Sequence, residues 1–149
     1  MLATKSIVYT EENQQKLEDT LYQKSLISFL FKELGKFRDP VEDIRACLDY
    51  ILDPKFGGHV FTATENQELR GVVLVTKTNM HKFVPGYLLV YIATSSEHRG
   101  QGIGKSLLEL VNTTLNSPIA LHVEHDNPAK RLYERMGFTS KYAEMRWYP

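Results

Sequence analysis

The chain has 149 residues, a length that suits one domain, and 42% of them are hydrophobic while 24% are charged. These fractions are typical of a folded globular protein and argue against disorder, and no apolar run is long enough to cross a membrane. Eighteen Lys and Arg balance eighteen Asp and Glu, so a broad basic surface for nucleic acid or for a membrane is not expected.

The first third of the chain is predicted to be mostly helical. Residues 6–9 predict a short strand, and Thr10 is a plausible N-cap for a helical stretch that ends at Gly35. A second helix is expected to begin at Asp39, where Pro40 and Glu42 complete a capping box, and to end before Pro54. The expected buried positions of these helices are Leu17, Leu21, Leu26, Ile27, Leu30, Phe31, Leu34, Val41, Ile44, Leu48, Ile51 and Leu52.

The middle of the chain changes to the pattern of strands. Two β-branched runs, at residues 59–64 and 69–77, are separated by a short polar turn and predict an antiparallel hairpin. Residues 87–93 are almost continuously apolar, which predicts a central strand buried on both faces.

Helices and strands alternate in the rest of the chain. We expect a helix over 102–115, a strand over 119–123, a helix between Asn127 and Gly137, and one or two closing strands over 138–148. The order predicts an α/β fold with a mixed, mostly antiparallel sheet flanked by helices, whose second half contains a βαβ unit.

A glycine-rich loop joins the most apolar strand to the helix that follows it. Residues 97–106 read E-H-R-G-Q-G-I-G-K-S. The amides at the start of the helix point outward and the helix dipole adds positive charge, so the loop is suited to an anion such as a phosphate. Arg99 and Lys105 flank the turn and could add to the charge.

The spacing of the glycines separates three kinds of phosphate loop. Gly104-Lys105-Ser106 fits the end of a Walker loop, but the first glycine of that motif would have to be at position 99. A G-x-G-x-x-G dinucleotide fingerprint also fails, because the glycines starting at Gly100 run G-x-G-x-G. A glycine-rich turn without a ligand is the remaining alternative.

Two motifs, in the correct order, resemble the GNAT superfamily of N-acetyltransferases. The first runs R-x-x-G-x-G from Arg99 and is similar to the pyrophosphate-binding motif Q/R-x-x-G-x-G/A of that family. The second runs N-x-A-x-x-L-Y-E-x-x-G-F from Asn127 to Phe138 and is similar to a second family signature. The specific resemblance covers about residues 87–140; the first half matches only in its order of elements.

The resemblance implies acetyl-CoA as acyl donor and a primary amine, of a small molecule or of a protein, as acceptor. In the family two neighbouring strands are splayed, and the pantetheine arm pairs with one of them. Asn127 would contact this arm, although a plain helix cap explains it equally well. Lys130, Arg131 and Arg135 could approach the 3′-phosphate unless they belong to a solvated face. The implied binding residues are Ile92, Ala93, Thr94, Arg99, Gly100, Gln101, Gly102, Ile103, Gly104, Lys105, Asn127, Lys130 and Tyr133.

Tyr133 holds the position of a family tyrosine that protonates the leaving thiolate; its alternative role is that of a core aromatic. A backbone amide at or beside Ile92 would polarise the thioester carbonyl. The base is unassigned, because residues 87–93 lack the carboxylate that many relatives carry there, and Glu124, His122, His125 or ordered water could take its place. The histidines have no metal-ligand spacing, so no metal is expected.

The acceptor would bind between the first two helices and the closing strands. An acidic excess in the helical half is a weak indication of a cationic acceptor, and a non-catalytic acyl-CoA-binding regulatory module is the alternative function. We expect one domain over residues 1–149, a cytoplasmic location suited to the single Cys47, and direct acetyl transfer without a covalent intermediate; a homodimer is left open. The aromatic residues expected to line the acceptor site are Phe29, Phe37, Tyr50, Phe56, Tyr142, Trp147 and Tyr148.

Overall fold

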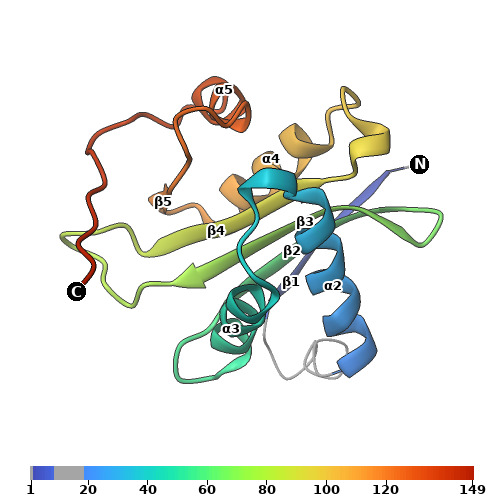
Figure 1. The fold of residues 1–149 in the computed structure, drawn as a ribbon, viewed down its shortest axis with the longest axis horizontal. Helices are drawn as coiled ribbons and strands as arrows, with labels where there is room; N and C mark the ends of the chain where they lie inside the picture. The colour runs from blue at the N-terminus through green and yellow to red at the C-terminus, as the bar shows by residue number, and fades with distance from the viewer. Residues whose placement is uncertain (1, 9–18) are drawn as a thin grey trace.

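A computed structural model describes residues 2–8 and 19–149 and contains one mixed sheet (Figure 1). The sheet order is β1-β2-β3-β4-β5; its first four strands are antiparallel, and β5 is parallel to β4. The predicted mixed, mostly antiparallel sheet with a βαβ unit is therefore confirmed. The elements are β1 (Ala3–Val8), α2 (Thr20–Glu33), a 3-10 turn η1 (Gly35–Phe37), α3 (Val41–Leu52), β2 (Gly58–Glu65), β3 (Glu68–Lys77), β4 (Tyr87–Thr94), a 3-10 turn η2 (Ser96–His98), α4 (Ile103–Leu115), β5 (Ile119–Leu121) and α5 (Ala129–Arg135).

The sheet separates two apolar cores. Helices α2 and α3 pack on one face, where Leu30 and Leu48 meet strand residues such as Leu74. Helix α4 packs on the other face, and Tyr133 of α5 joins that core. None of the helices in the described part of the chain is long and apolar enough to cross a membrane.

A β-bulge in β4 decides which of its side chains face which core. Leu74 of β3 lies opposite Tyr91 and Val75 lies opposite Leu89, so Val90 is the extra residue. The Tyr91 side chain consequently packs against α2 and α3, whereas Leu89 and Ile92 pack on the α4 side. The sheet's middle strand is β3, and β4 alternates between buried and half-buried residues, so the predicted burial of β4 on both faces is only partly correct.

Beyond the bulge, one edge of β4 has no strand beside it. The pairing of β4 with β5 is limited to Tyr87–Leu89 against Ile119–Leu121. From residue 90 to 94, no other strand among the described residues pairs with this edge. Strand β5 ends at Leu121, so β4 is unpaired on this side from residue 90 up to its end at Thr94, before the glycine-rich loop.

Of three predictions about the first helix, one needs correction and two concern residues that the structure does not describe. Asp19 is the N-cap of α2, and its carboxylate accepts from the amides of Leu21 at 2.9 Å and Tyr22 at 3.4 Å. Leu21 is 76% exposed rather than buried, because it lies in the first turn, away from the sheet. The expected cap at Thr10 and the core position Leu17 lie outside the described residues.

The capping box predicted at Asp39 is wrong. The residue at the cap position of α3 is Pro40, and no side chain caps the helix. The Asp39 carboxylate instead accepts a hydrogen bond from the Tyr91 hydroxyl at 2.6 Å. The buried Tyr91 hydroxyl needs a hydrogen-bond acceptor. The charged Asp39 carboxylate makes a stronger hydrogen bond to this hydroxyl than it would make to an exposed helix amide.

The closing strands predicted for residues 138–148 are also wrong. After Gly137, which ends α5 with φ +93°, the described chain has no further helix or strand. Met145 and Trp147 are 90% and 84% exposed. A segment with strand propensity forms a strand only where a sheet edge is available for its hydrogen bonds. The edge strand β5 is only three residues long.

Candidate functional site

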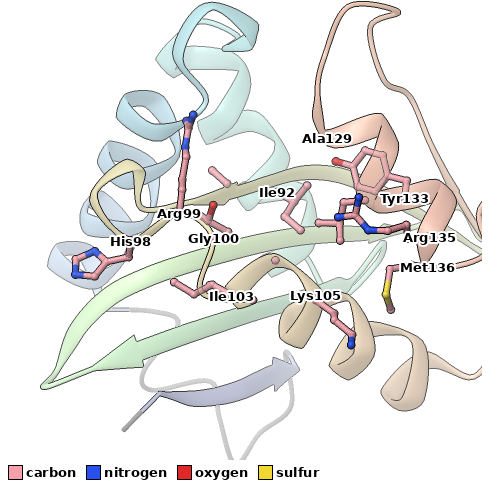
Figure 2. Close-up of a pocket in the computed structure, with 15 residues that line it drawn as sticks. Ile92, His98, Arg99, Gly100, Ile103, Lys105, Ala129, Tyr133, Arg135 and Met136 are labelled. Carbon is pink, nitrogen blue, oxygen red and sulfur yellow. The ribbon is translucent and has the colours of Figure 1, made fainter.

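A cavity of about 770 Å³ lies where β4 ends, between the start of α4 and one side of α5 (Figure 2). Three stretches form it: the free end of β4, the glycine-rich loop with the first turn of α4, and α5. Its lining residues are Ile92, Ala93, Thr94, His98, Arg99, Gly100, Gly102, Ile103, Gly104, Lys105, Ala129, Leu132, Tyr133, Arg135 and Met136.

The glycine-rich loop turns the first amides of α4 toward this cavity. Gly100 and Gly102 have φ of +77° and +78°, a left-handed conformation that favours glycine, and a Cβ at either position would meet no atom within 4 Å. Their role is therefore conformational. Gly102 is the N-cap of α4 and no side chain caps this helix, so its first N–H groups are available to an anion.

Gly104 lies close to α5. It lies inside α4, and a Cβ there would come within 2.9 Å of the Leu132 Cδ2 atom of α5. Glycine at this position thus allows α5 to approach α4 closely, which sets the width of the cavity between them. The two family motifs meet in space at this contact.

Basic side chains surround the loop without being tied to it. Arg99 is exposed, and Lys105 lies 3.8 Å from Glu109 on the solvent side of α4. Figure 2 shows Arg99 and Lys105 leaving the loop in different directions, while Arg135 lies along the cavity beside Tyr133. The cavity therefore carries local positive charge in a chain of zero net charge.

The base of the loop is anchored by buried polar contacts. The Ser96 amide donates to the Glu33 carboxylate at 2.8 Å, and this carboxylate is only 5% exposed although it is at the end of α2. Ser95 Oγ lies 2.9 Å from His98 Nδ1. The contact with Glu33 holds η2 against the end of α2, and the Ser95–His98 contact closes the turn itself.

Tyr133 carries the polar group at the inner end of the cavity. Its side chain is 7% exposed and packs edge-on against Phe138, with ring centroids 6.0 Å apart. Its hydroxyl has no hydrogen-bond partner among the described residues, and burial raises its pKa to about 12. The phenol thus stays protonated at neutral pH and can donate to a ligand in the cavity.

Most of the sequence-predicted binding residues line this cavity, but four candidates do not: Gln101, Glu124, Asn127 and Lys130. The Asn127 side chain accepts from the Ala129 amide at 2.9 Å, which is the helix-cap role that the sequence also allowed. Glu124 is exposed and lies outside the cavity lining. In the described ranges, no group of three or more His, Cys, Asp and Glu residues could hold a metal ion.

The sequence does not point to His98 or Met136 as binding residues, whereas Arg135 is one of three basic residues on this helix expected either to approach the 3′-phosphate or to belong to a solvated face. His98, Arg135 and Met136 all line the cavity. A signal for them was available, because His98 precedes the first motif and the other two lie within the second. Their side-chain directions, however, depend on how α5 packs against α4.

The predicted acceptor-site aromatics are dispersed. Tyr50 and Phe56 stack on each other with centroids 4.4 Å apart, and the Tyr50 hydroxyl donates to the Lys77 carbonyl at the opposite end of the sheet from the cavity. Phe29 packs against the core under α2 and α3. Tyr142, Trp147 and Tyr148 are 82%, 84% and 76% exposed. Only Phe37 lies on the loop between α2 and α3 that faces the end of β4.

Two polar contacts connect this loop to β4 and to the segment before α5. Asp39 receives the 2.6 Å hydrogen bond from Tyr91 of β4. Lys36 Nζ lies 3.1 Å from Asp126 Oδ2, in the segment before α5. The loop therefore contacts both β4, through Tyr91, and the segment between β5 and α5, through Asp126.

A family model and a relative that match this chain are both acetyltransferases. Residues 56–140 match the family model of the acetyltransferase (GNAT) domain. The chain is 31% identical over 84 residues to a 5-NmdU N-acetyltransferase of Pseudomonas phage PaMx11, a match that covers 55% of this chain and 58% of that relative.

Solved structures share the fold across the whole chain. The ribosomal-protein-S18-alanine N-acetyltransferase of Escherichia coli superposes with a TM-score of 0.71 at 18% identity, covering 100% of this chain and 84% of that one. An aminoglycoside N-acetyltransferase in complex with CoA also gives a TM-score of 0.71, at 14% identity, covering 100% of this chain and 95% of that one.

Proposed function

Since the chain belongs to the acetyltransferase (GNAT) domain family, we propose that it transfers an acetyl group from acetyl-CoA to a primary amine by direct attack. One observation carries the proposal. A single cavity joins an uncapped helix N-terminus, suited to a pyrophosphate, to a buried tyrosine hydroxyl without a partner, suited to protonate a leaving group.

The residues present fit an acyl-CoA donor. The amides of the glycine-rich loop and the first turn of α4 would hold the pyrophosphate, with Lys105 and Arg135 adding charge. The unpaired edge of β4 at residues 92–94 offers backbone groups to the amides of the pantetheine arm. A cavity of about 770 Å³ is in the range of small-molecule sites.

The chain's own groups have two roles in the transfer. The Ile92 backbone amide, or a neighbouring one, would donate to the carbonyl oxygen as negative charge develops there. Tyr133 would give its proton to the sulfur as the carbon–sulfur bond breaks. Because burial raises the pKa of Tyr133 to about 12, the phenol keeps this proton until a strong base appears beside it.

The acceptor is proposed to be an amine because the relatives that share the fold are named as N-acetyltransferases. The named acceptors in those proteins differ, including a ribosomal-protein alanine and aminoglycosides. The Asp39 carboxylate, bound to Tyr91 on the α2 and α3 side of the sheet, favours a cationic amine over a neutral or acidic one.

The test combines CoA binding with thiol release. Wild-type protein should bind CoA in calorimetry and release thiol from acetyl-CoA with at least one member of an amine panel. Tyr133→Phe should lower kcat about 100-fold while leaving the Kd of CoA unchanged, because general acid catalysis contributes roughly this factor. Tyr142→Phe, the same change at an exposed tyrosine of the C-terminal segment, is the matched control.

Two other results would contradict the proposed function. Binding of CoA without thiol release across pH 6 to 9 would favour a non-catalytic acyl-CoA-binding module. Affinity for Mg-ATP without affinity for CoA would instead point to the Walker-type alternative for residues 104–106.

A further inference from the structure

We propose that Tyr91 and Asp39 accept the proton of the attacking amine, with Tyr91 touching the amine and Asp39 acting through the Tyr91 hydroxyl. The inference rests on the proposed acetyl transfer and supplies the base that this function lacks. Strand β4 has no carboxylate, and Glu124 lies outside the cavity lining. Asp39 belongs to the loop before α3 and lies 52 residues from Tyr91 in the chain, so the sequence does not connect them.

The bulge at Val90 places Tyr91 on the correct side of the sheet. Ile92 lines the donor cavity, whereas the neighbouring Tyr91 side chain packs on the face of α2 and α3. A direct transfer needs the amine to approach the carbonyl carbon from outside the donor's own binding pocket. Tyr91 is therefore the sequence neighbour of Ile92, which lines the donor cavity, while its phenol lies on the side of the sheet from which an acceptor could come.

The loop that carries Asp39 is held over this region at two points. Its Lys36 ammonium contacts Asp126, in the segment before α5, at 3.1 Å. Its Asp39 carboxylate contacts the Tyr91 hydroxyl at 2.6 Å. The pairing of β4 with β5 stops at Leu89, so no described strand pairs with the β5 side of β4 at Tyr91. An amine that enters beneath the loop would thus meet the Asp39–Tyr91 pair first.

The exposure of the Tyr91 and Asp39 side chains also suits a route for a proton from the amine to solvent. Tyr91 is 8% exposed, so its hydroxyl lies at the boundary of the core, whereas Asp39 is exposed. A proton that reaches Asp39 can be released to solvent. Of the other titratable groups that act on Tyr91, both Cys47 and Asp43 are on α3. Burial raises the pKa of Cys47 to about 12, so this thiol remains neutral.

Each proton that moves in the proposed acetyl transfer has a donor and an acceptor. Tyr91 donates its hydroxyl hydrogen to Asp39, which leaves the oxygen lone pairs free to accept from an amine N–H. As the amine nitrogen forms its bond to the acetyl carbon, its surplus proton passes to Tyr91 and the Tyr91 proton passes to Asp39. The carbon–sulfur bond breaks, and the sulfur takes the Tyr133 proton. Asp39 then releases one proton to water and Tyr133 regains one.

A purely structural pair would behave differently on mutation. Asp39→Asn keeps an oxygen that can accept from the Tyr91 hydroxyl, but the amide does not take up a proton. Tyr91→Phe removes the hydroxyl and leaves the ring in the core. If the pair only stabilises the fold, Asp39→Asn should leave kcat unchanged; if it accepts the proton, kcat must fall.

The experiment measures thiol release with the best amine of the panel for wild type, Asp39→Asn, Tyr91→Phe and the double variant. We expect each single variant to lose about 100-fold in kcat with the KM of acetyl-CoA within twofold of wild type. The double variant should be no slower than the slower single variant, because the two residues act as one unit. Asp39→Glu should recover part of the activity.

The control is Glu42→Gln, which removes a carboxylate from the first turn of α3, three residues beyond Asp39, and should retain wild-type kcat. Additive losses in the double variant, or an Asp39→Asn protein with wild-type kcat, would overturn the inference. A wild-type protein that releases no thiol with any amine would instead overturn the proposed function, so the two failures are distinguishable. If Tyr91→Phe does not fold, Asp39→Asn and Asp39→Glu at the exposed position decide the question.

Discussion

Replacing Gly102 by alanine should weaken CoA binding more than it weakens the fold. Gly102 has φ +78° and ψ 16°, and a Cβ there would meet nothing within 4 Å, so the cost is backbone strain and not steric overlap. A non-glycine residue in this conformation costs about 1 kcal/mol, which lowers Tm by roughly 3 °C for a domain of this size.

The loss of binding should be larger. The chain relieves the strain by rotating φ toward negative values, which turns the first amides of α4 away from the cavity. Losing one hydrogen bond between an amide and a charged phosphate costs about 1.5 to 3 kcal/mol, so the Kd of CoA should rise about 10-fold or more. Calorimetric titration with CoA and thermal unfolding measure the two quantities separately.

Gly57 is the matched control for this prediction. Its φ is +84°, and a Cβ there would make only an ordinary contact, 3.4 Å, with the Lys77 side chain at the turn between α3 and β2. Gly57→Ala should therefore show a similar loss of Tm and an unchanged Kd for CoA. If Gly102→Ala binds CoA as wild type does, or if both variants lose affinity equally, the anion-binding role of the loop is refuted.

Three further predictions concern groups outside the cavity. Burial raises the pKa of Cys47 to about 12, so Ellman's reagent at pH 8 should leave this thiol unmodified in the folded chain and titrate one thiol in urea; fast labelling of the folded chain would contradict the burial. Burial, with a smaller effect of Lys77, lowers the pKa of His59 to about 4, so this contribution to stability is complete above pH 6.5 and is lost as the pH falls toward 4. The loss should be about 1 to 2 kcal/mol by pH 5 in urea unfolding, and it should disappear in His59→Phe. Trp147, the single tryptophan of the sequence, is 84% exposed, so acrylamide should quench its fluorescence in the folded protein nearly as well as in urea; strong protection would show that the C-terminal segment is covered.

The parts of the fold that depend on neighbouring residues could be predicted from the sequence. The glycine-rich loop before α4, and the Asn127 cap and Gly137 stop of α5, follow from local rules of helix starts and ends. The hairpin of β2 and β3 is equally local, and its turn residues Asn66 and Gln67 have the positive φ that a tight turn needs.

The errors concern features that depend on residues far apart in the chain. Asp39 has the local sequence of a helix cap, but a phenol 52 residues away takes its carboxylate. The segment after Gly137 has strand-forming residues, but whether they form a strand depends on an available sheet edge. The bulge at Val90 is invisible in an uninterrupted apolar run, because side-chain alternation is apparent only when polar residues mark one face.

On the proposed function, that bulge also explains how a chain of zero net charge would present opposite charges to its two substrates. Without the extra residue, strict alternation would put Leu89 and Tyr91 on the same face of the sheet; with it, Leu89 packs toward α4 and Tyr91 toward α3. The α4 face then has the helix-start amides and basic side chains that are proposed to hold the donor, and the α2 and α3 face has the Asp39 carboxylate that is proposed to accept the amine proton. Local charges of opposite sign on the two faces of one strand are thus compatible with a net charge of zero.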